Sequence, residues 1–170
     1  QAIISGFTGL SGFDTTARIW DARTGKIRFE LPGHEQRVAS ASFSSNGSWV
    51  VTASWDGTAR VWEASTGRSL AVLKISKGNR ADFAAFSPDG TRVVTSCDET
   101  KELLLWDWAK RPGDPVAAFT GHEGSIRDFA FSADGRLLVT ASSDKTARIW
   151  ETTTGKNCHI LSGHEDFVNG

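Results

Sequence analysis

Four tryptophans recur at a nearly constant interval along this chain of 170 residues. The intervals are 42, 44 and 44 residues, and the tryptophans are Trp20, Trp62, Trp106 and Trp150. The tripeptide Thr-Ala-Arg begins four residues before the first, second and fourth of them, and an aspartate stands six residues before each of the same three. A fixed period of this length is typical of a tandem array in which each small unit packs against its neighbours. The chain is therefore expected to adopt a repeat fold of about four units.

Within one period the sequence predicts four short β-strands joined by tight turns. Residues 38–43 and 58–62 alternate apolar or small residues with polar ones, which is the pattern of a half-buried strand. Residues 49–54 are rich in strand-forming residues, Asp56-Gly57 is a hairpin signal, and residues 69–74 supply a fourth strand. One antiparallel meander cannot bury both of its faces alone. We therefore expect an all-β fold in which such sheets stack radially as the blades of a β-propeller.

Composition narrows the classes of function. The net charge is −1 and 23% of the residues are charged, which argues against a nucleic-acid or membrane-surface protein. No window approaches the ~18 apolar residues of a membrane helix, and the N-terminus carries no signal-peptide pattern. The two cysteines, Cys97 and Cys158, imply no disulfide framework and fit free thiols in the cytoplasm. Because the chain lacks methionine and starts at Gln1, we expect it to be processed or cut from a longer protein.

A longer pattern surrounds the tryptophans. It runs Gly-His, strand, Ser-x-Asp-Gly, strand, Asp-x-Thr, strand, Trp-Asp or Trp-Glu, and it extends from Gly33-His34 to Trp62-Glu63 and from Gly121-His122 to Trp150-Glu151. A partial copy runs from Asp14 to Trp20-Asp21. This pattern resembles the WD-repeat (WD40) family of β-propellers over essentially the whole chain. Its residue string Asp-Gly-Thr-Ala-Arg-Val-Trp looks like that of the regular bacterial members. The resemblance implies a platform for protein or peptide partners.

Two repeats contain the same four polar residues at the same offsets. They are His34, Thr52, Asp56 and Trp62 in one repeat, and His122, Thr140, Asp144 and Trp150 in the other. A hydroxyl, a histidine and an aspartate also make a hydrolase triad, but a catalytic site is needed once, whereas this set recurs. The resemblance implies a structural tetrad instead, hydrogen-bonded from tryptophan through threonine and histidine to aspartate. Without a nucleophile elbow, a phosphate-binding glycine loop or metal-ligand spacing, we expect no catalytic residue, no cofactor and no metal.

The period divides the chain into blades. The first is a partial blade, residues 1–32, completed by residues 163–170 or by another segment; the others are residues 33–75, 76–120 and 121–162. Aligning Asp14 with Asp56 places Gln1 at the position of Phe43, so the first blade is expected to lack its opening strand.

The third blade is irregular. Aligning Phe86 with Phe43 places Lys77 where His34 stands, and Asp98 lies eight residues before Trp106 instead of six. A complete tetrad is therefore in doubt in this blade.

Four blades are at the lower limit of closed propellers, which have 4–8, and the resembled family favours about seven. An isolated array would leave open sheet edges. Two arrangements remain open: the chain is a segment of a longer propeller, or two copies close one ring of about eight blades.

The resemblance places partner binding on the face made by the Gly-His loops and the Asp-Gly-type hairpins. The residue before each hairpin aspartate is expected at the rim of that face, and two arginines near the channel mouth add charge; these candidates are Phe13, Trp55, Ser143, Arg37 and Arg127. One alternative is a module that binds nucleic acid or another anionic ligand, supported only by the local basic cluster Arg68, Lys74, Lys77 and Arg80. A second alternative is a regulatory propeller within a larger multidomain enzyme.

Overall fold

The computed structural model describes residues 2–5, 14–75, 80–97 and 99–169, and for residues 2–5 it describes the backbone. The described residues form fifteen strands and no helix, arranged as separate antiparallel sheets. No described segment could therefore cross a membrane as a helix. The predicted all-β class, with four-stranded antiparallel meanders, is confirmed.

Each sheet is a meander in which consecutive strands pair. The first blade contains β1 (Ala2–Ser5), β2 (Ala17–Asp21) and β3 (Ile27–Leu31). The second contains β4 (Val38–Phe43), β5 (Trp49–Ser54), β6 (Thr58–Glu63) and β7 (Ser69–Lys74). The third contains β8 (Ala84–Phe86), β9 (Val93–Cys97), β10 (Glu102–Trp106) and β11 (Ala117–Phe119). The fourth contains β12 (Ile126–Phe131), β13 (Leu137–Ser142), β14 (Ala147–Glu151) and β15 (Asn157–Leu161).

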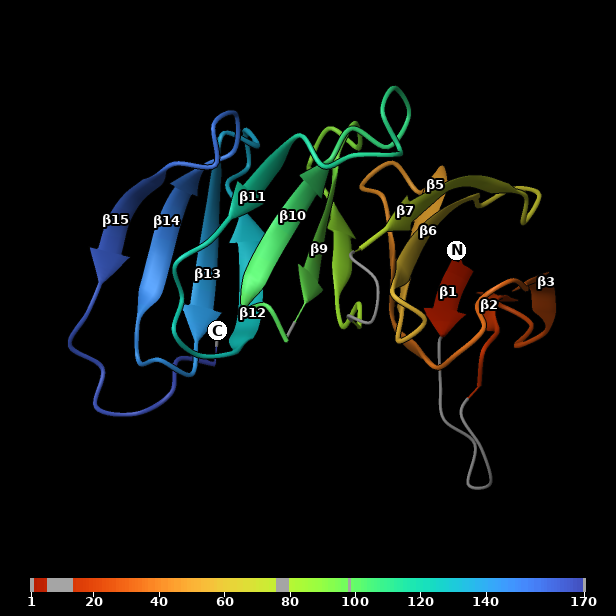
Figure 1. Ribbon diagram of the computed structural model, residues 1–170. Helices are drawn as coiled ribbons and strands as arrows, with labels where there is room; N and C mark the ends of the chain where they lie inside the picture. The colour runs from red at the N-terminus through yellow and green to blue at the C-terminus, as the bar shows by residue number, and fades with distance from the viewer. Residues whose placement is uncertain (1, 6–13, 76–79, 98, 170) are drawn as a thin grey trace.

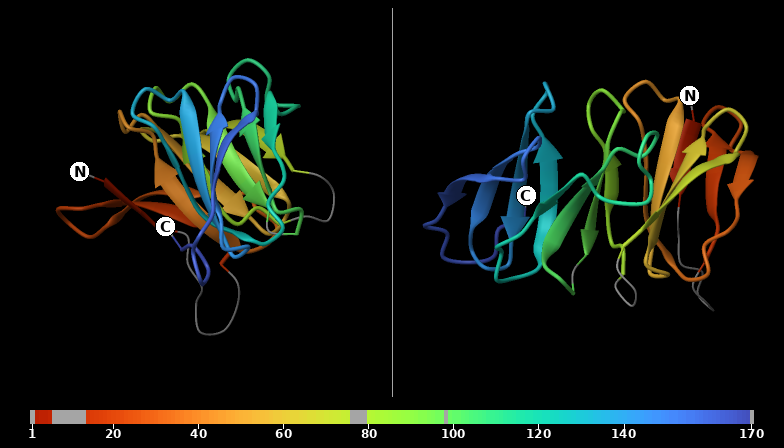
Figure 2. Two further views of the ribbon diagram at one scale, coloured as in Figure 1. Left: turned by 90° about the vertical axis from the view of Figure 1, so that its left-hand side faces the viewer. Right: turned by 45° about the horizontal axis from the view of Figure 1, so that its top comes forward.

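The blades stand side by side in chain order and form an open arc. The first blade lies at one end of the arc and the fourth at the other, so the two chain ends are far apart (Figures 1 and 2). The hairpins that join β9 to β10 and β13 to β14 lie at the bottom of Figure 1, and the long β10–β11 connection lies at the top. Each blade therefore offers loops to two opposite faces of the array.

Apolar clusters fill the three seams between neighbouring blades. Val50 packs with Ile19 and Leu31 of the first blade, whereas the next residue, Val51, packs with Phe86 of the third. Successive side chains of a strand point to opposite faces of its sheet. This explains why the second strand of each blade is apolar at consecutive positions and does not alternate with polar residues.

The first blade differs in register from the ungapped alignment of Asp14 with Asp56. Ile3 lies opposite Trp20, as Val50 lies opposite Trp62, whereas the ungapped alignment assigns residue 8 to that position. Ser5 lies opposite Arg18, as Thr52 lies opposite Arg60, so β1 is the second strand of this blade. The alignment missed five extra residues between this strand and Asp14.

No fourth strand joins the first blade among the described residues. Residues 162–169 form no strand, and in Figure 1 the C-terminus lies beside the fourth blade, far from the first. Completion of the first blade by residues 163–170 remains a prediction. In the described structure, residues 163–169 lie beside the fourth blade and do not pair with the first (Figure 1).

Candidate functional site

The tetrad of the second blade is a continuous hydrogen-bonded chain. Trp62 Nε1 donates to Thr52 Oγ1 over 2.9 Å, and Thr52 Oγ1 lies 2.7 Å from His34 Nε2. His34 Nδ1 lies 2.8 Å from Asp56 Oδ2. A carboxylate only accepts, so Nδ1 carries the proton, and Thr52 donates to Nε2. The fourth blade repeats the chain with separations of 2.9, 2.7 and 2.7 Å.

Burial and hydrogen bonding set the charge states of these groups. Burial is the largest influence on the pKa of His34 and of His122 and lowers both, although the neighbouring carboxylate opposes it. Burial alone would raise the pKa of the Asp144 carboxyl. Hydrogen bonds from Thr146, His122 and backbone amides outweigh burial and hold that pKa well below its ordinary value. Near neutral pH each tetrad therefore pairs a neutral histidine with an ionised aspartate.

The threonine hydroxyls have no capacity left for chemistry. Thr52 and Thr140 are fully buried, and each engages both an indole and an imidazole. The arrangement braces the inside of a blade, where a network with every member paired specifies one packing.

The third blade keeps only part of this chain among its described residues. Trp106 Nε1 donates to Thr95 Oγ1 over 3.0 Å. Lys77 and Asp98, which stand at the histidine and aspartate positions, lie outside the described residues. The structure thus shows a tryptophan–threonine pair in this blade.

In the two tetrad repeats, the glycine of the Gly-His pair has a left-handed backbone conformation and lies close to an arginine. Gly33 has φ of +135°, and a Cβ there would lie 2.7 Å from Arg60 Nη1. Gly121 has φ of +129° and stands in the same relation to Arg148, at 2.7 Å. Only glycine combines this backbone conformation with the space that the guanidinium needs. The glycine therefore allows an arginine of the third strand, Arg60 or Arg148, to pack against the Gly-His loop that leads into the blade.

A hollow of about 280 Å³ opens where the second, third and fourth blades meet. It lies beside the residues that begin β4, β8 and β12 and beside the end of β9. Its walls include two predicted arginines, the predicted tryptophan and two residues of the irregular third blade: Arg37, Arg127, Trp55, Asp82 and Phe83. The structure thus brings three of the five predicted face residues to one place.

Trp55 is half-buried, and charged groups cover it. The Cζ atoms of Arg37 and Arg80 lie 4.6 and 4.4 Å from its ring centroid. Its Nε1 donates to Asp82 Oδ1 over 3.2 Å. The indole therefore acts as a fixed support for two guanidinium groups.

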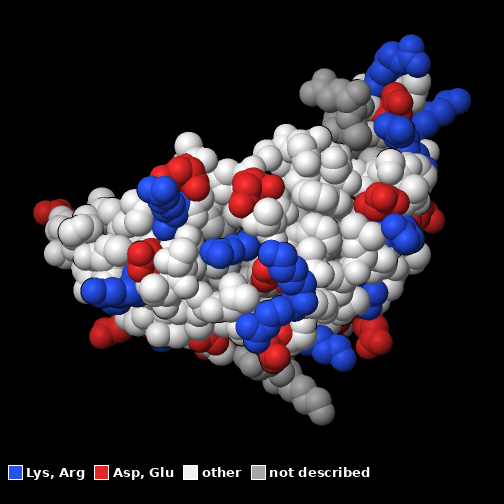
Figure 3. Space-filling view, turned by 90° about the horizontal axis from the view of Figure 1, so that it is seen from above, with Lys and Arg blue, Asp and Glu red and all other residues white. Residues whose placement is uncertain are grey.

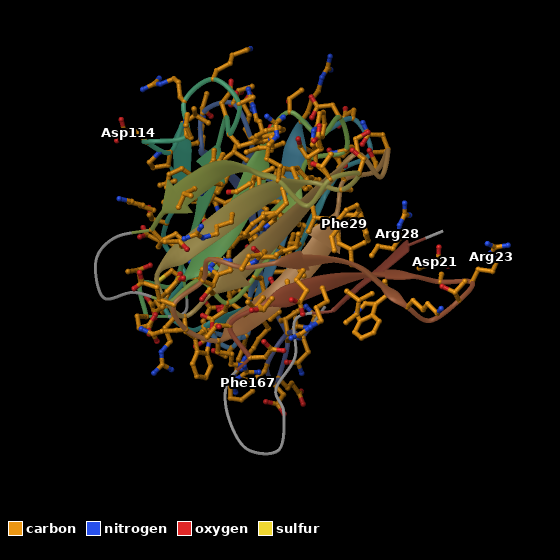
Figure 4. All side chains as sticks on the ribbon, turned by 90° about the vertical axis from the view of Figure 1, so that its right-hand side faces the viewer. Asp21, Arg23, Arg28, Phe29, Asp114 and Phe167 are labelled. Atoms are coloured by element: carbon orange, nitrogen blue, oxygen red, sulfur yellow. The ribbon has the colours of Figure 1, made fainter. Side chains whose placement is uncertain are left out.

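Arg127 reaches the hollow through a β-bulge. The register of β12 with β13 shifts between Ile126 and Asp128, and the extra residue is Arg127. Its Cζ lies 5.9 Å from the ring centroid of Phe167. A bulge re-aims one side chain without breaking the sheet. Figure 4 shows Phe167 at the opposite end of the molecule from Asp114 of the β10–β11 connection. Phe167 therefore lies on the hairpin face, which is the face that carries the β9–β10 and β13–β14 hairpins (Figures 1 and 4).

The remaining candidates lie elsewhere. Ser143 is half-buried and donates from its backbone nitrogen to the carbonyl of Ser125 over 3.0 Å, and it does not line the hollow. Phe13 lies outside the described residues. Phe83 and Asp82 were missed because the third blade departs from the repeat, and no periodic pattern points to them.

Two stretches of the chain, residues 25–63 and 113–151, match the family described as "WD domain, G-beta repeat". The chain contains WD repeats. The matched WD repeats run from β3 to β6 and from β11 to β14, so each begins with the last strand of one blade and ends in the third strand of the next. One sequence repeat thus spans a seam and ties two blades together.

Curated relatives of this WD-repeat chain are nuclear distribution proteins. The chain is 28% identical over 165 residues to nuclear distribution protein PAC1 of Arthroderma otae, covering 91% of this chain and 35% of that protein. It is 30% identical over 166 residues to PAC1-2 of Uncinocarpus reesii, covering 91% and 36%. It is 26% identical over 175 residues to nudF of Aspergillus niger, covering 92% and 39%. The WD-repeat chain therefore spans about a third of the length of these relatives.

Proposed function

We propose that this chain is part of a non-catalytic WD-repeat platform that binds a protein or peptide at the hollow between its second, third and fourth blades. The observation that carries the proposal is the composition of that hollow. Cationic, aromatic and apolar side chains from three blades meet there at the hairpin face. Arginine and aromatic residues are the types that dominate protein interfaces.

The closed tetrads support a non-catalytic role. Their histidines and threonines are buried and fully engaged, so they offer no base or nucleophile to a bound molecule. Among the residues that the structure describes, no three His, Cys, Asp or Glu side chains cluster as a metal site would require.

A nucleic-acid role is less well supported. Arg68 and Lys74 stand at opposite ends of β7, about 20 Å apart at ~3.3 Å per residue, so the basic cluster of the sequence is not one patch. Arg68 and Arg80 also face Glu63 and Glu99, each at 3.8 Å. On the face seen from the top of Figure 1, acidic and basic residues are interspersed (Figure 3). A nucleic-acid surface needs a stripe of one sign.

Two free thiols support a reducing location. Cys97 is buried and Cys158 is exposed, and neither forms a disulfide. We propose the cytoplasm as the compartment, since thiols stay reduced there.

The relatives suggest the kind of process. The names of these relatives assign them to nuclear distribution, and we propose that this chain takes part in a process of that kind by binding other proteins.

Capture followed by footprinting tests the platform. The immobilised chain and its Trp55→Ala and Phe83→Ser variants are incubated with an extract of the cells that express it. Arg136→Ala, an exposed change in a turn of the fourth blade, is the matched control. We expect capture by the wild type and the control, weaker capture by both hollow variants, and slower hydrogen exchange of residues 80–84 and 125–128 in the complex. A partner retained equally by all four proteins would refute this site.

A further inference from the structure

Two arginines of the hollow lack a carboxylate partner. Arg18, Arg68, Arg80 and Arg136 each lie within 4 Å of an acidic side chain. Within the described part of the chain no such pair involves Arg37 or Arg127, and Arg37 Nε is buried without a hydrogen-bond partner. A buried donor left unpaired costs free energy that a bound acceptor would recover.

The Arg37 guanidinium is held in place before any ligand arrives, whereas Arg127 is exposed and is directed toward the hollow by its bulge. Arg37 stacks on Trp55, whose indole is tied to Asp82, and Arg127 projects from a bulge and packs near Phe167. Fixed, planar guanidinium groups bind carboxylates at a lower entropic cost than free ones because little motion is lost. The positions of the two cations favour an anionic group in the hollow.

The net charge of the residues that line the hollow is positive, which also favours an anionic ligand. Among the described residues, the charged side chains that line the hollow are Arg37, Arg127 and Asp82, which leaves one positive charge in excess, whereas the whole chain carries −1. Asp82 already accepts the indole N–H, so part of its capacity is used.

An apolar neighbour accompanies the charge. Phe83 lines the same hollow and is 46% exposed, a large fraction for a phenylalanine. The volume of about 280 Å³ lies just below the ~300–1,000 Å³ of small-molecule sites. The hollow thus has room for one or two side chains and not for a large cofactor.

We infer that the hollow recognises an acidic peptide segment, in which a glutamate or aspartate carboxylate binds Arg37 and Arg127 and an adjacent apolar side chain packs on Phe83. This inference rests on the proposed platform function and adds the chemistry of the partner. The paired arginines select the carboxylate, and Phe83 selects its neighbour.

Selection from a random octapeptide library tests the inference. The 170-residue chain is the bait, and the probes are the recovered peptides and their Glu→Gln or Asp→Asn forms. We expect enrichment of an acidic residue next to Phe, Leu or Ile. Neutralising the peptide, or making Arg37→Gln or Arg127→Gln in the protein, should weaken binding about tenfold, the loss expected for a charge-assisted hydrogen bond.

Three controls make the result decisive. Arg136→Gln removes the same charge from a distant turn and should leave affinity unchanged. Thermal unfolding of all variants shows that the fold persists. Raising the salt concentration from 50 to 500 mM should weaken the acidic peptide and spare its neutral form.

The inference and the platform can fail separately. Selected peptides that are apolar, and whose binding depends on Trp55 and Phe83 but not on either arginine, would refute the acidic-peptide inference. The proposed platform function would still stand. An oligonucleotide that binds more tightly than any peptide with the same arginine dependence would replace the peptide with nucleic acid. No selection at all, with a captured partner protecting a different face, would remove both.

Discussion

The second and fourth blades share one sequence pattern and one tetrad geometry, yet the equivalent apolar face is buried in the second blade and exposed in the fourth. Leu73 and Val51 of the second blade are 0% exposed, whereas their equivalents Leu161 and Val139 are 43% and 38% exposed. The third blade covers the former, and no described strand covers the latter. The tetrad therefore belongs to a single blade, whereas the apolar core belongs to the seam between two blades.

The edge of the fourth blade already begins a further seam. The Val168 amide donates to the Ser142 carbonyl over 3.1 Å, as the Ala81 amide donates to that of Ser54 over 3.0 Å. Lys145 Nζ donates to the Glu165 carbonyl over 2.9 Å. Lys101 does the same to Glu123 over 2.7 Å. Residues after Gly163 thus lie as the start of another blade would, which fits both the longer propeller and the two-chain ring expected from the sequence.

The largest expected effect separates the two apolar faces. Leu73→Ala should lower the free energy of unfolding by about 2–5 kcal/mol because it leaves a cavity, and Leu161→Ala by under about 1 kcal/mol. Urea unfolding of the 170-residue chain measures both.

The same pair of variants tests what covers the fourth blade in solution. If light scattering shows a dimer and Leu161→Ala costs as much as Leu73→Ala, a second copy buries this face. A monomer in which the two costs are equal would contradict the burial difference itself.

The next effect compares a tetrad with the shorter pair of the third blade. Thr52→Val leaves two buried partners unpaired, Trp62 and His34, and should cost about 2–3 kcal/mol. Thr95→Val leaves only Trp106 and should cost about 1 kcal/mol. Thermal unfolding checks the order, and Thr140→Val serves as a repeat of the first measurement in the open blade. Equal losses for Thr52→Val and Thr95→Val would mean that the imidazole adds nothing.

Acid should weaken both tetrads in the same pH window. The pKa of His34 and of His122 is lowered from the ordinary 6.5, so the unfolded chain takes up protons first as the pH falls. The stability that the neutral histidines contribute is complete above pH 6.5 and is lost below it. The lowered pKa of Asp56 and Asp144 adds a second loss below the ordinary 3.8. Unfolding midpoints between pH 8 and pH 3 measure both steps, and a His34→Asn, His122→Asn variant should lack the first.

The smallest effect concerns the two exposed lysine contacts of the seams. Lys101→Gln and Lys145→Gln should each cost no more than about 0.5–1 kcal/mol, because water competes for both partners. Hydrogen exchange at the Val168 amide sharpens the comparison, since Lys145→Gln should speed it and Lys101→Gln should not. Exchange that is already fast in the wild type would show that the last residues do not stay hydrogen-bonded to the fourth blade.

Much of the fold and of the site's framework could be predicted from periodicity. The tryptophan period predicted the repeated four-stranded meanders, and the tetrad residues stand at fixed offsets within one period. The register of β1 escaped prediction because five extra residues separate it from Asp14, and an ungapped alignment hides such an insertion. Phe83 and Asp82 escaped because the third blade follows the repeat least closely.

By itself, the sequence determined the strands, the turns and the tetrads, since each depends on residues less than one period apart. Only the tertiary structure decided which apolar faces are buried and which side chains share the hollow. Leu73 and Leu161 occupy the same position in their blades, but burial is a property of the neighbouring sheet. Arg37, Phe83 and Arg127 meet because three consecutive blades bring the beginnings of their first strands together, a distance that no period in the sequence encodes.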